Sequence, residues 1–529
     1  MSRDMNRTYS HKPESGETHS NGTFNLRYYF DPTYYKPGGP VILLQSGETS
    51  VTGRLPYLQK GIVYQLAKAT GGMGVILEHR YYGTSFPVDN LETESLRFLT
   101  TQQAMADQAY FQQNVVFPGF EDQNLTAPNT PYITYGGSYA GAFVAFMRTI
   151  YPEFTWGAIS SSGVTEAIWD FWEYYEAIRL NAPADCVRNQ QVLMNIIDNI
   201  IMKNDSQTID DLKNAFGLGE VSNPVDVANV ISFGIQSWQG RNWDPEVGDP
   251  SFYEYCGNIT NTTLQWFDTT DLASNASALI EAGGWGNESE TLTPIMLNLI
   301  GYTNFTEVSS CELTQNECFA NDNASQPMYT DKSIDNQGNL SWAYQYCTQW
   351  GYIQTGSGVP ADQLPLIPRV LDLEYLTSIC RYAFNLTTPA KVEEINQYGG
   401  FNISYPRLAI VGGSADPWRA ASPLALDVPD RLNETSTVSQ PLILIEGAVH
   451  HWDENGLFPN ETTPELPPPA VASAQAELAQ VVQAWLQEWA SSNSSTPAQT
   501  TPYTGAASAV SYSTAVIVFG ALLTAVALL

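Results

Sequence analysis

Short apolar segments recur at both ends of the chain and predict the strands of one sheet. Several are continuous apolar runs, which is the pattern of parallel strands buried on both faces. Between these runs lie segments with helical spacing, so the ends alternate between strand and helix. The expected strands are residues 23–31, 40–45, 74–78, 131–135, 156–160, 407–412 and 440–445.

Two further stretches complete this pattern. Leu478, Val482, Trp485 and Trp489 recur at steps of four, three and four, which predicts a packing helix over residues 471–489. From about residue 165 to residue 385 the strand–helix rhythm is lost. We interpret that stretch as a mainly helical insertion, a cap over the sheet.

Composition restricts the class of protein. The 529 residues include 23 basic and 55 acidic side chains, a net charge of −32. We therefore expect no nucleic-acid binding, because a protein that binds nucleic acid needs a basic face. All six cysteines lie in the predicted cap. The chain contains no C-x-x-C pair, so the cysteines do not predict a metal site. Three disulfides are expected, with 15 pairings open.

Glycosylation sequons indicate the compartment. The chain holds 16 N-x-S/T sites, more than chance predicts, which favours the secretory pathway and therefore disulfides over free thiols. Residues 1–40 show no apolar signal peptide, so we expect that the true start lies upstream, with unconventional secretion as the alternative. Residues 1–20 are expected to be a disordered leader.

The other end of the sequence predicts a membrane anchor. Residues 491–513 resemble a Ser/Thr/Pro-rich stalk, and residues 514–529 are apolar. Small residues before a hydrophobic terminus predict a glycolipid (GPI) attachment signal, with Gly505 as the attachment site. An ordinary C-terminal membrane helix is the alternative.

The sharpest chemical signal is YGGSYAG at residues 135–141. It follows a predicted strand and opens a predicted helix, with small residues, Gly136 and Ala140, two positions either side of Ser138. That is the setting of a nucleophile elbow, in which a sharp turn exposes a serine hydroxyl. The alternative is an ordinary glycine-rich turn.

A serine nucleophile needs a base and an acid. In the order Ser…Asp…His of α/β-hydrolases the base comes last, which leaves His450 and His451. Asp416 follows the predicted strand 407–412 and is the candidate acid, or else a simple turn residue. The backbone N–H of Tyr139 and the loop around Gly47 and Glu48 are the expected oxyanion donors.

Five segments together resemble the family of prolyl carboxypeptidase and dipeptidyl peptidase II, which are serine peptidases. They are EHRYYG (78–83), LRFLTTQQAMAD (96–107), GGSYAG (136–141), DPW (416–418) and HHWD (450–453). The resemblance implies Ser138 as nucleophile, Asp416 as acid, His450 as base and cleavage after proline. It also implies a Cys347–Cys380 disulfide. Trp418 is then a candidate wall of the proline pocket, or else a core residue.

The sequence thus predicts an α/β-hydrolase sheet domain, residues 21–165 and 385–490, interrupted by a disulfide-braced cap, residues 166–384. Glu78 and Arg80 are expected to form a buried structural pair. The expected activity is hydrolysis of proline-containing peptides without a cofactor or metal. A lipase or esterase, or an inactive surface glycoprotein, remain alternatives, and the oligomeric state stays open, a homodimer included.

Overall fold

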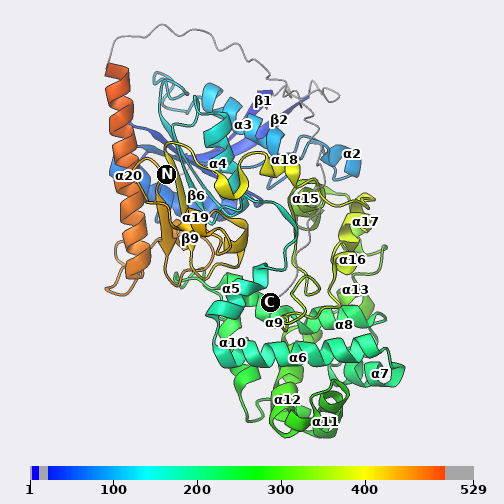
Figure 1. Cartoon of the computed structure of the whole chain (residues 1–529). Helices are drawn as coiled ribbons and strands as arrows, with labels where there is room; N and C mark the ends of the chain where they lie inside the picture. Colours follow the sequence, from blue (N-terminus) through cyan, green and yellow to red (C-terminus); the bar gives the residue numbers. More distant parts are fainter. Residues whose placement is uncertain (1–2, 11–21, 495–529) are drawn as a thin grey trace, which may run out of the picture.

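The computed structural model describes residues 3–10 and 22–494, and its centre is an eight-stranded sheet (Figure 1). The strand order is β1-β2-β4-β3-β5-β6-β9-β10. From β4 to β10 all neighbours are parallel, whereas β2 is antiparallel to both β1 and β4. The strands are β1 (Arg3–Ser10), β2 (Thr23–Asp31), β3 (Val41–Gln45), β4 (Met73–Leu77), β5 (Tyr132–Gly137), β6 (Gly157–Ser161), β9 (Leu408–Gly413) and β10 (Leu442–Ile445).

All seven predicted strands are present within two residues of their expected bounds. The continuous apolar runs have the expected cause, since β3, β4, β6 and β9 are buried at every position. The prediction of a disordered leader is wrong for residues 3–10, which form β1 against β2. An edge strand pairs through its backbone and needs no apolar run, so the hydrophobic pattern gives no sign of it.

Helices cover both faces of the sheet. On one face, α20 (Pro469–Ser494) packs beside α1 (Ile62–Thr70), and their apolar side chains form one core with Ile42, Ile133 and Val411 of the strands. Leu478, Val482 and Trp485 are buried there, as the helical spacing predicts. On the other face, α3 (Thr101–Asn114) and α4 (Tyr139–Ile150) cover the strands (Figure 1).

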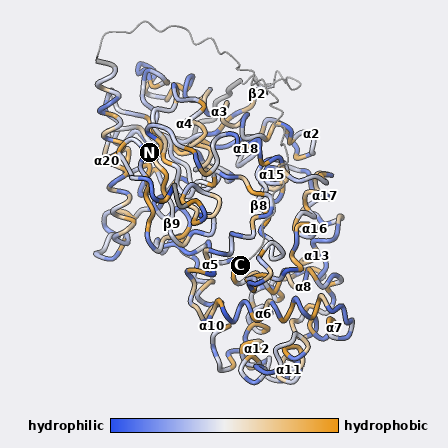
Figure 2. Tube along the Cα trace, viewed as in Figure 1, coloured by the Kyte–Doolittle hydropathy of each residue, from blue (hydrophilic) through white to orange (hydrophobic). Residues whose placement is uncertain are grey.

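The cap lies between β6 and β9 in the sequence and is mainly helical (Figure 1). Its core is continuous with the α4 face of the sheet domain, because Phe143 and Phe146 share one cluster with Leu193, Ile300 and Trp350. Figure 2 shows hydrophobic segments in the sheet and in the cap alike. The larger cap helices are α5 (Tyr174–Asn181), α6 (Ala184–Lys203), α7 (Ser206–Ala215), α8 (Pro224–Ile231), α10 (Ser251–Thr260), α11 (Ala273–Ala282), α12 (Ser289–Thr306), α15 (Gln337–Gln345) and α17 (Ser378–Phe384).

Shorter elements complete the chain. Two three-residue strands, β7 (Ile168–Asp170) and β8 (Gly351–Ile353), form a separate parallel pair at the base of the cap, which the sequence did not predict. The short α-helices are α2 (Thr93–Leu96), α9 (Phe233–Gln236), α13 (Gln315–Phe319), α14 (Pro327–Thr330), α16 (Leu373–Leu376), α18 (Glu393–Asn396) and α19 (Pro429–Leu432).

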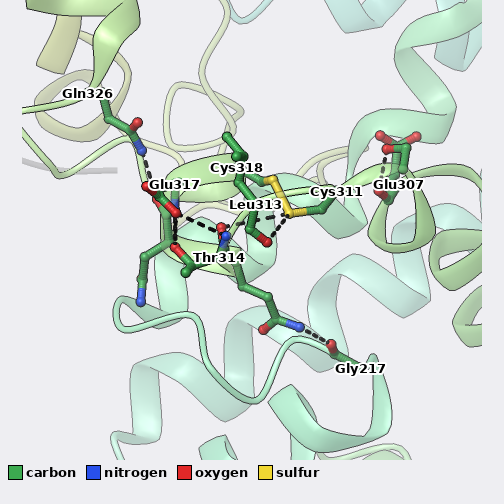
Figure 3. The surroundings of a disulfide bond; sticks show 11 residues. Gly217, Glu307, Cys311, Leu313, Thr314, Glu317, Cys318 and Gln326 are labelled. Atoms are coloured by element: carbon green, nitrogen blue, oxygen red, sulfur yellow. Dashed lines mark hydrogen bonds between the residues drawn. A yellow bond between two sulfur atoms is a disulfide. The ribbon is translucent and has the colours of Figure 1, made fainter.

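Three disulfides brace the cap: Cys186–Cys256, Cys311–Cys318 and Cys347–Cys380. The last is the pair that the family resemblance implies. The Cys311–Cys318 loop also carries a capping box, in which Thr314 and Glu317 bond each other's backbone N–H (Figure 3). Gln315 donates to the Gly217 carbonyl and ties this loop to the end of α7.

The predicted anchor falls outside the described part of the chain. Gly505 and residues 514–529 belong to it, so the expected attachment site stays a prediction. Among the described residues, no helix has both the length and the apolar character that a bilayer crossing requires.

Candidate active site

Ser138 occupies a strained turn between β5 and α4. Its φ of 60° and ψ of −126° are rare for a residue with a side chain, and strain of this kind is typical of a nucleophile elbow. Small neighbours make the turn possible. A Cβ on Gly136 would lie 2.0 Å from the Ala140 carbonyl oxygen, and one on Gly141 would lie 2.7 Å from that of Ser161. The local geometry predicted from the motif is therefore present.

Asp416 and His450 form a buried pair. Asp416 follows β9 and His450 follows β10, so both lie at the carboxyl edge of the parallel strands, as Ser138 does. Both carboxylate oxygens lie 3.0 Å from His450 Nδ1. Because a carboxylate only accepts, Nδ1 carries the proton and Nε2 is left as an acceptor. Nε2 is buried, and no side chain or backbone group of residues 3–10 and 22–494 bonds it.

The end of β6 connects these loops to the serine. Ser161 accepts the Ser138 N–H at 2.9 Å through its carbonyl. The next residue, Ser162, accepts the His451 N–H at 2.9 Å through its hydroxyl, and the same hydroxyl helps to lower the pKa of Asp416. One two-residue segment thus contacts the turn of Ser138 and the loops of Asp416 and His451.

Burial favours the neutral form of His450. Burial lowers the pKa of His450 below its ordinary value, and this effect outweighs the opposing attraction of the Asp416 carboxylate. The same contact holds the pKa of Asp416 below its usual range despite its burial. A neutral imidazole beside an ionised carboxylate is the state that a general base requires.

His451 has a different environment from His450. Its Nδ1 lies 2.9 Å from Glu454 Oε2, and its side chain keeps 20% exposure. Burial lowers the pKa of His451, but Glu454 more than compensates and raises it above the ordinary value. Arg54 adds a second cation, 3.9 Å from the same carboxylate. The sequence left His450 and His451 as alternatives, and of these His450 is the one that contacts Asp416.

The expected oxyanion loop lies against the start of α4. Gly47 has a φ of +69°, and a Cβ there would lie 3.2 Å from the Ala140 Cβ and 3.9 Å from the Tyr139 ring. The Gly47 N–H makes a long bond, 3.4 Å, to the Gln45 side chain. Glu48 is half-buried, and its charge partly opposes the lowering of the His450 pKa. Gly47, Glu48 and Tyr139 thus lie together beside Ser138.

The expected Glu78–Arg80 pair is wrong. Arg80 instead makes a two-bond contact with Asp107, at 2.6 and 2.7 Å. The planar guanidinium matches a carboxylate in this bidentate way. Glu78 accepts from the Val51 N–H and the Ser85 hydroxyl and lies 3.9 Å from Arg27.

Trp418 lies between His450 and a cavity at the base of the cap. Its ring is 6.2 Å from the His450 ring and stacks on Phe171 at 5.5 Å. The cavity measures about 260 Å³. Its lining side chains are aromatic, aliphatic or amide groups: Tyr175, Asn229, Gln236, Trp342, Tyr346, Tyr352, Ile353, Gln354, Ile367, Leu371, Leu376 and Trp418.

Sequence reasoning missed Ser162, Glu454 and Arg54, which are polar residues that support these loops. Ser162, His451, Glu454 and Arg54 contact one another or the candidate triad. Glu454 directly follows the HHWD segment, which is the one local signal. Ser162 and Arg54 carry no motif, because their roles depend on contacts between distant segments.

Comparisons with known proteins give relatives along most of the chain. A "Probable extracellular serine carboxypeptidase" of Arthroderma benhamiae is 50% identical over 483 residues, 90% of this chain and 66% of that protein. The chain thus spans just under two thirds of that relative. "Serine protease vicPa" of Bipolaris victoriae is 29% identical, over 82% of this chain and 81% of its own length. The human "Thymus-specific serine protease" is 25% identical, over 88% of this chain and 83% of its own length.

The family model described as Serine carboxypeptidase S28 matches residues 17–466. That range contains the turn of Ser138, both candidate partners and the whole cap. The chain belongs to the serine carboxypeptidase S28 family.

Proposed function

We propose that the protein is a serine peptidase that hydrolyses peptide bonds on the carboxyl side of proline. The observation that carries the proposal is the buried contact of Asp416 with His450 at the sheet edge that also holds Ser138. Membership of the family supports it. The name of the relative from Arthroderma benhamiae supports the narrower proposal that a single C-terminal residue is released.

The mechanism follows from the geometry of the pair. Asp416 fixes the tautomer of His450, so that Nε2 takes the proton of the Ser138 hydroxyl while the oxygen attacks the peptide carbonyl. The attack converts the carbonyl into a tetrahedral intermediate that carries the oxyanion. The first N–H groups of a helix have no partner within it, so the Tyr139 N–H is free to bond the oxyanion. His450 then gives its proton to the leaving amine, the C–N bond breaks and the acyl-enzyme remains. Water, deprotonated by His450, hydrolyses the acyl-enzyme and frees Ser138.

The cavity beside Trp418 supports the preference for proline. Proline has an apolar ring without charge, and aromatic walls give such a ring contact area without unpaired polar groups. Trp418, Tyr352 and Tyr346 supply such walls. Trp418 is therefore proposed as a substrate-binding residue.

The proposal also includes the compartment. Three disulfides in the cap and the many sequons support secretion. A GPI attachment at Gly505 is proposed on the sequence alone.

Peptides with one proline and matched ends test the proposal. We expect mass spectrometry to show cleavage after proline in a peptide with a free C-terminus and none in its amide. Cleavage of both would contradict the C-terminal mode, and faster hydrolysis of fatty-acid p-nitrophenyl esters would favour an esterase. Asp416→Asn should lower kcat by about 10⁴-fold, because the imidazole takes the wrong tautomer. Asp372→Asn is the matched control, since Asp372 caps α16 as Asp416 caps residues 417–421.

A further inference from the structure

One segment of the cap reaches back to the sheet domain and contacts the loops of the candidate acid and base. It consists of residues Trp238–Glu246, which we call the strap. The strap leaves the cap core at Trp238 and enters the core under α20 with Trp243. It therefore crosses the carboxyl edge of the sheet, where the candidate triad lies.

The first contact of the strap is with the loop of the acid. Trp238 donates its indole N–H to the carbonyl of Ala415 at 2.8 Å. Ala415 directly precedes Asp416, and Trp238 and Ala415 are each at most 3% exposed. Arg241 lies over the Trp238 ring at 4.1 Å. A buried carbonyl that loses its donor is costly, so this bond fixes the path of the backbone into Asp416.

The second contact is with the loop of the base. Trp243 donates its indole N–H to the Trp452 carbonyl at 2.8 Å. Trp452 in turn donates its own indole N–H to the Arg241 carbonyl at 2.9 Å. This reciprocal pair holds the residue that follows His451, two positions from His450.

The far end of the strap is tied to the sheet domain by charge. Lys60, which is buried, lies 2.5 Å from Glu246 and 3.6 Å from Asp244. The Lys60 backbone packs directly on Gly456, in the segment that follows His450. A Cβ on Gly456 would lie 1.7 Å from the carbonyl oxygen of Lys60. The strap is thus fixed at both ends, with the two catalytic loops between.

The strap also contacts the proposed substrate wall. Gln239 Oε1 accepts the Trp418 indole N–H at 2.8 Å and the Tyr174 hydroxyl at 2.9 Å. The strap therefore bonds the substrate wall Trp418, the residue before Asp416 and the residue two positions after His450.

We propose that Trp238 and Trp243 are positioning residues, through which the cap sets the orientation of Asp416 and His450. The inference rests on the proposed function. It implies that the cap, besides shaping the substrate cavity, forms part of the support of the triad.

The test compares indole donors that have different acceptors. Trp238→Phe and Trp243→Phe keep an aromatic ring and remove the N–H. Trp485→Phe is the matched control, since Trp485 is fully buried and donates to the Val438 carbonyl at 2.7 Å, away from both loops. A fluorophosphonate titration counts the active sites, and kcat, KM and the labelling rate are then expressed per titrated site.

We expect kcat and the labelling rate per site to fall about tenfold or more in both strap variants, because small shifts of a triad are costly. KM should change less than twofold, and Trp485→Phe should lose only thermal stability. If kcat per site stays at the wild-type value in both strap variants, the inference is wrong. If Trp243→Phe yields no titratable protein, Trp452→Phe removes the reciprocal bond and gives the same test.

Failure of the proposed function has a different signature. Wild-type protein would then release nothing from proline peptides or would not label. A labelled wild type with unaffected strap variants contradicts the strap alone.

Discussion

His79 Nε2 and the Tyr139 hydroxyl lie 2.9 Å apart in the core behind the candidate nucleophile. His79 Nδ1 lies 2.7 Å from the Arg80 carbonyl, which only accepts, so Nδ1 carries the proton and the tyrosine donates to Nε2. A histidine that the chain order excludes as the base therefore holds the side chain of the residue after Ser138.

This contact predicts a pH dependence of stability. Burial lowers the pKa of His79 to about 3, against about 6.5 in an unfolded chain. The unfolded state takes up the proton first, so the contribution of neutral His79 is complete above about pH 6.5 and is lost as the pH falls toward 3. When the pH falls from 6.5 to 5, the unfolding free energy of wild type should therefore decrease by about 2 kcal/mol more than that of His79→Gln. Urea unfolding at both pH values measures this difference, and equal losses would contradict it.

A second prediction concerns the pH dependence of the activity. Because burial lowers the pKa of His450, the acidic limb of kcat/KM should lie below the ordinary value of about 6.5. The pH profile of kcat/KM on a proline peptide measures the limb. A limb at or above pH 6.5 would show that Asp416 dominates over burial.

The two adjacent histidines should differ in their effect on the rate. His450→Gln should lower kcat by about 10⁴-fold or more, because Asp416 contacts only this imidazole. His451→Gln should cost much less, since His451 pairs with Glu454 and lies outside the proposed proton path. Rates per titrated site in both variants test this difference. The reverse order would make His451 the base.

The disulfides should differ in their contribution to stability. Cys186–Cys256 closes a separation of 70 residues and Cys311–Cys318 one of 7. Loop entropy assigns about 4 kcal/mol to the first and about 2.5 kcal/mol to the second. Paired serine substitutions, measured by denaturant unfolding, should give that order. A larger loss at Cys311–Cys318 would mean that its capping box depends on the disulfide.

Much of the fold and the candidate site could be predicted from local patterns. The sheet strands were predicted because parallel strands buried on both faces are continuous apolar runs. Ser138 was predicted because an elbow constrains the residues beside it, Gly136 and Ala140. Asp416 and His450 followed from chain order and from motifs, and the structure brings these two together.

The rest depends on contacts between distant segments, which leave no local pattern. Arg80 pairs with Asp107, 27 residues away, in place of Glu78. Trp243 belongs to no motif, and its role is visible only from its bond to Trp452. β1 has no apolar pattern, because its pairing with β2 uses the backbone.

The identity of the nucleophile is the central claim, and covalent labelling tests it most directly. A fluorophosphonate should modify one serine, and peptide mapping by mass spectrometry should place the label on Ser138. Ser138→Ala should then remain folded, take up no label and release no product from a proline peptide. A label on another serine, or peptidase activity that persists in Ser138→Ala, would contradict the account.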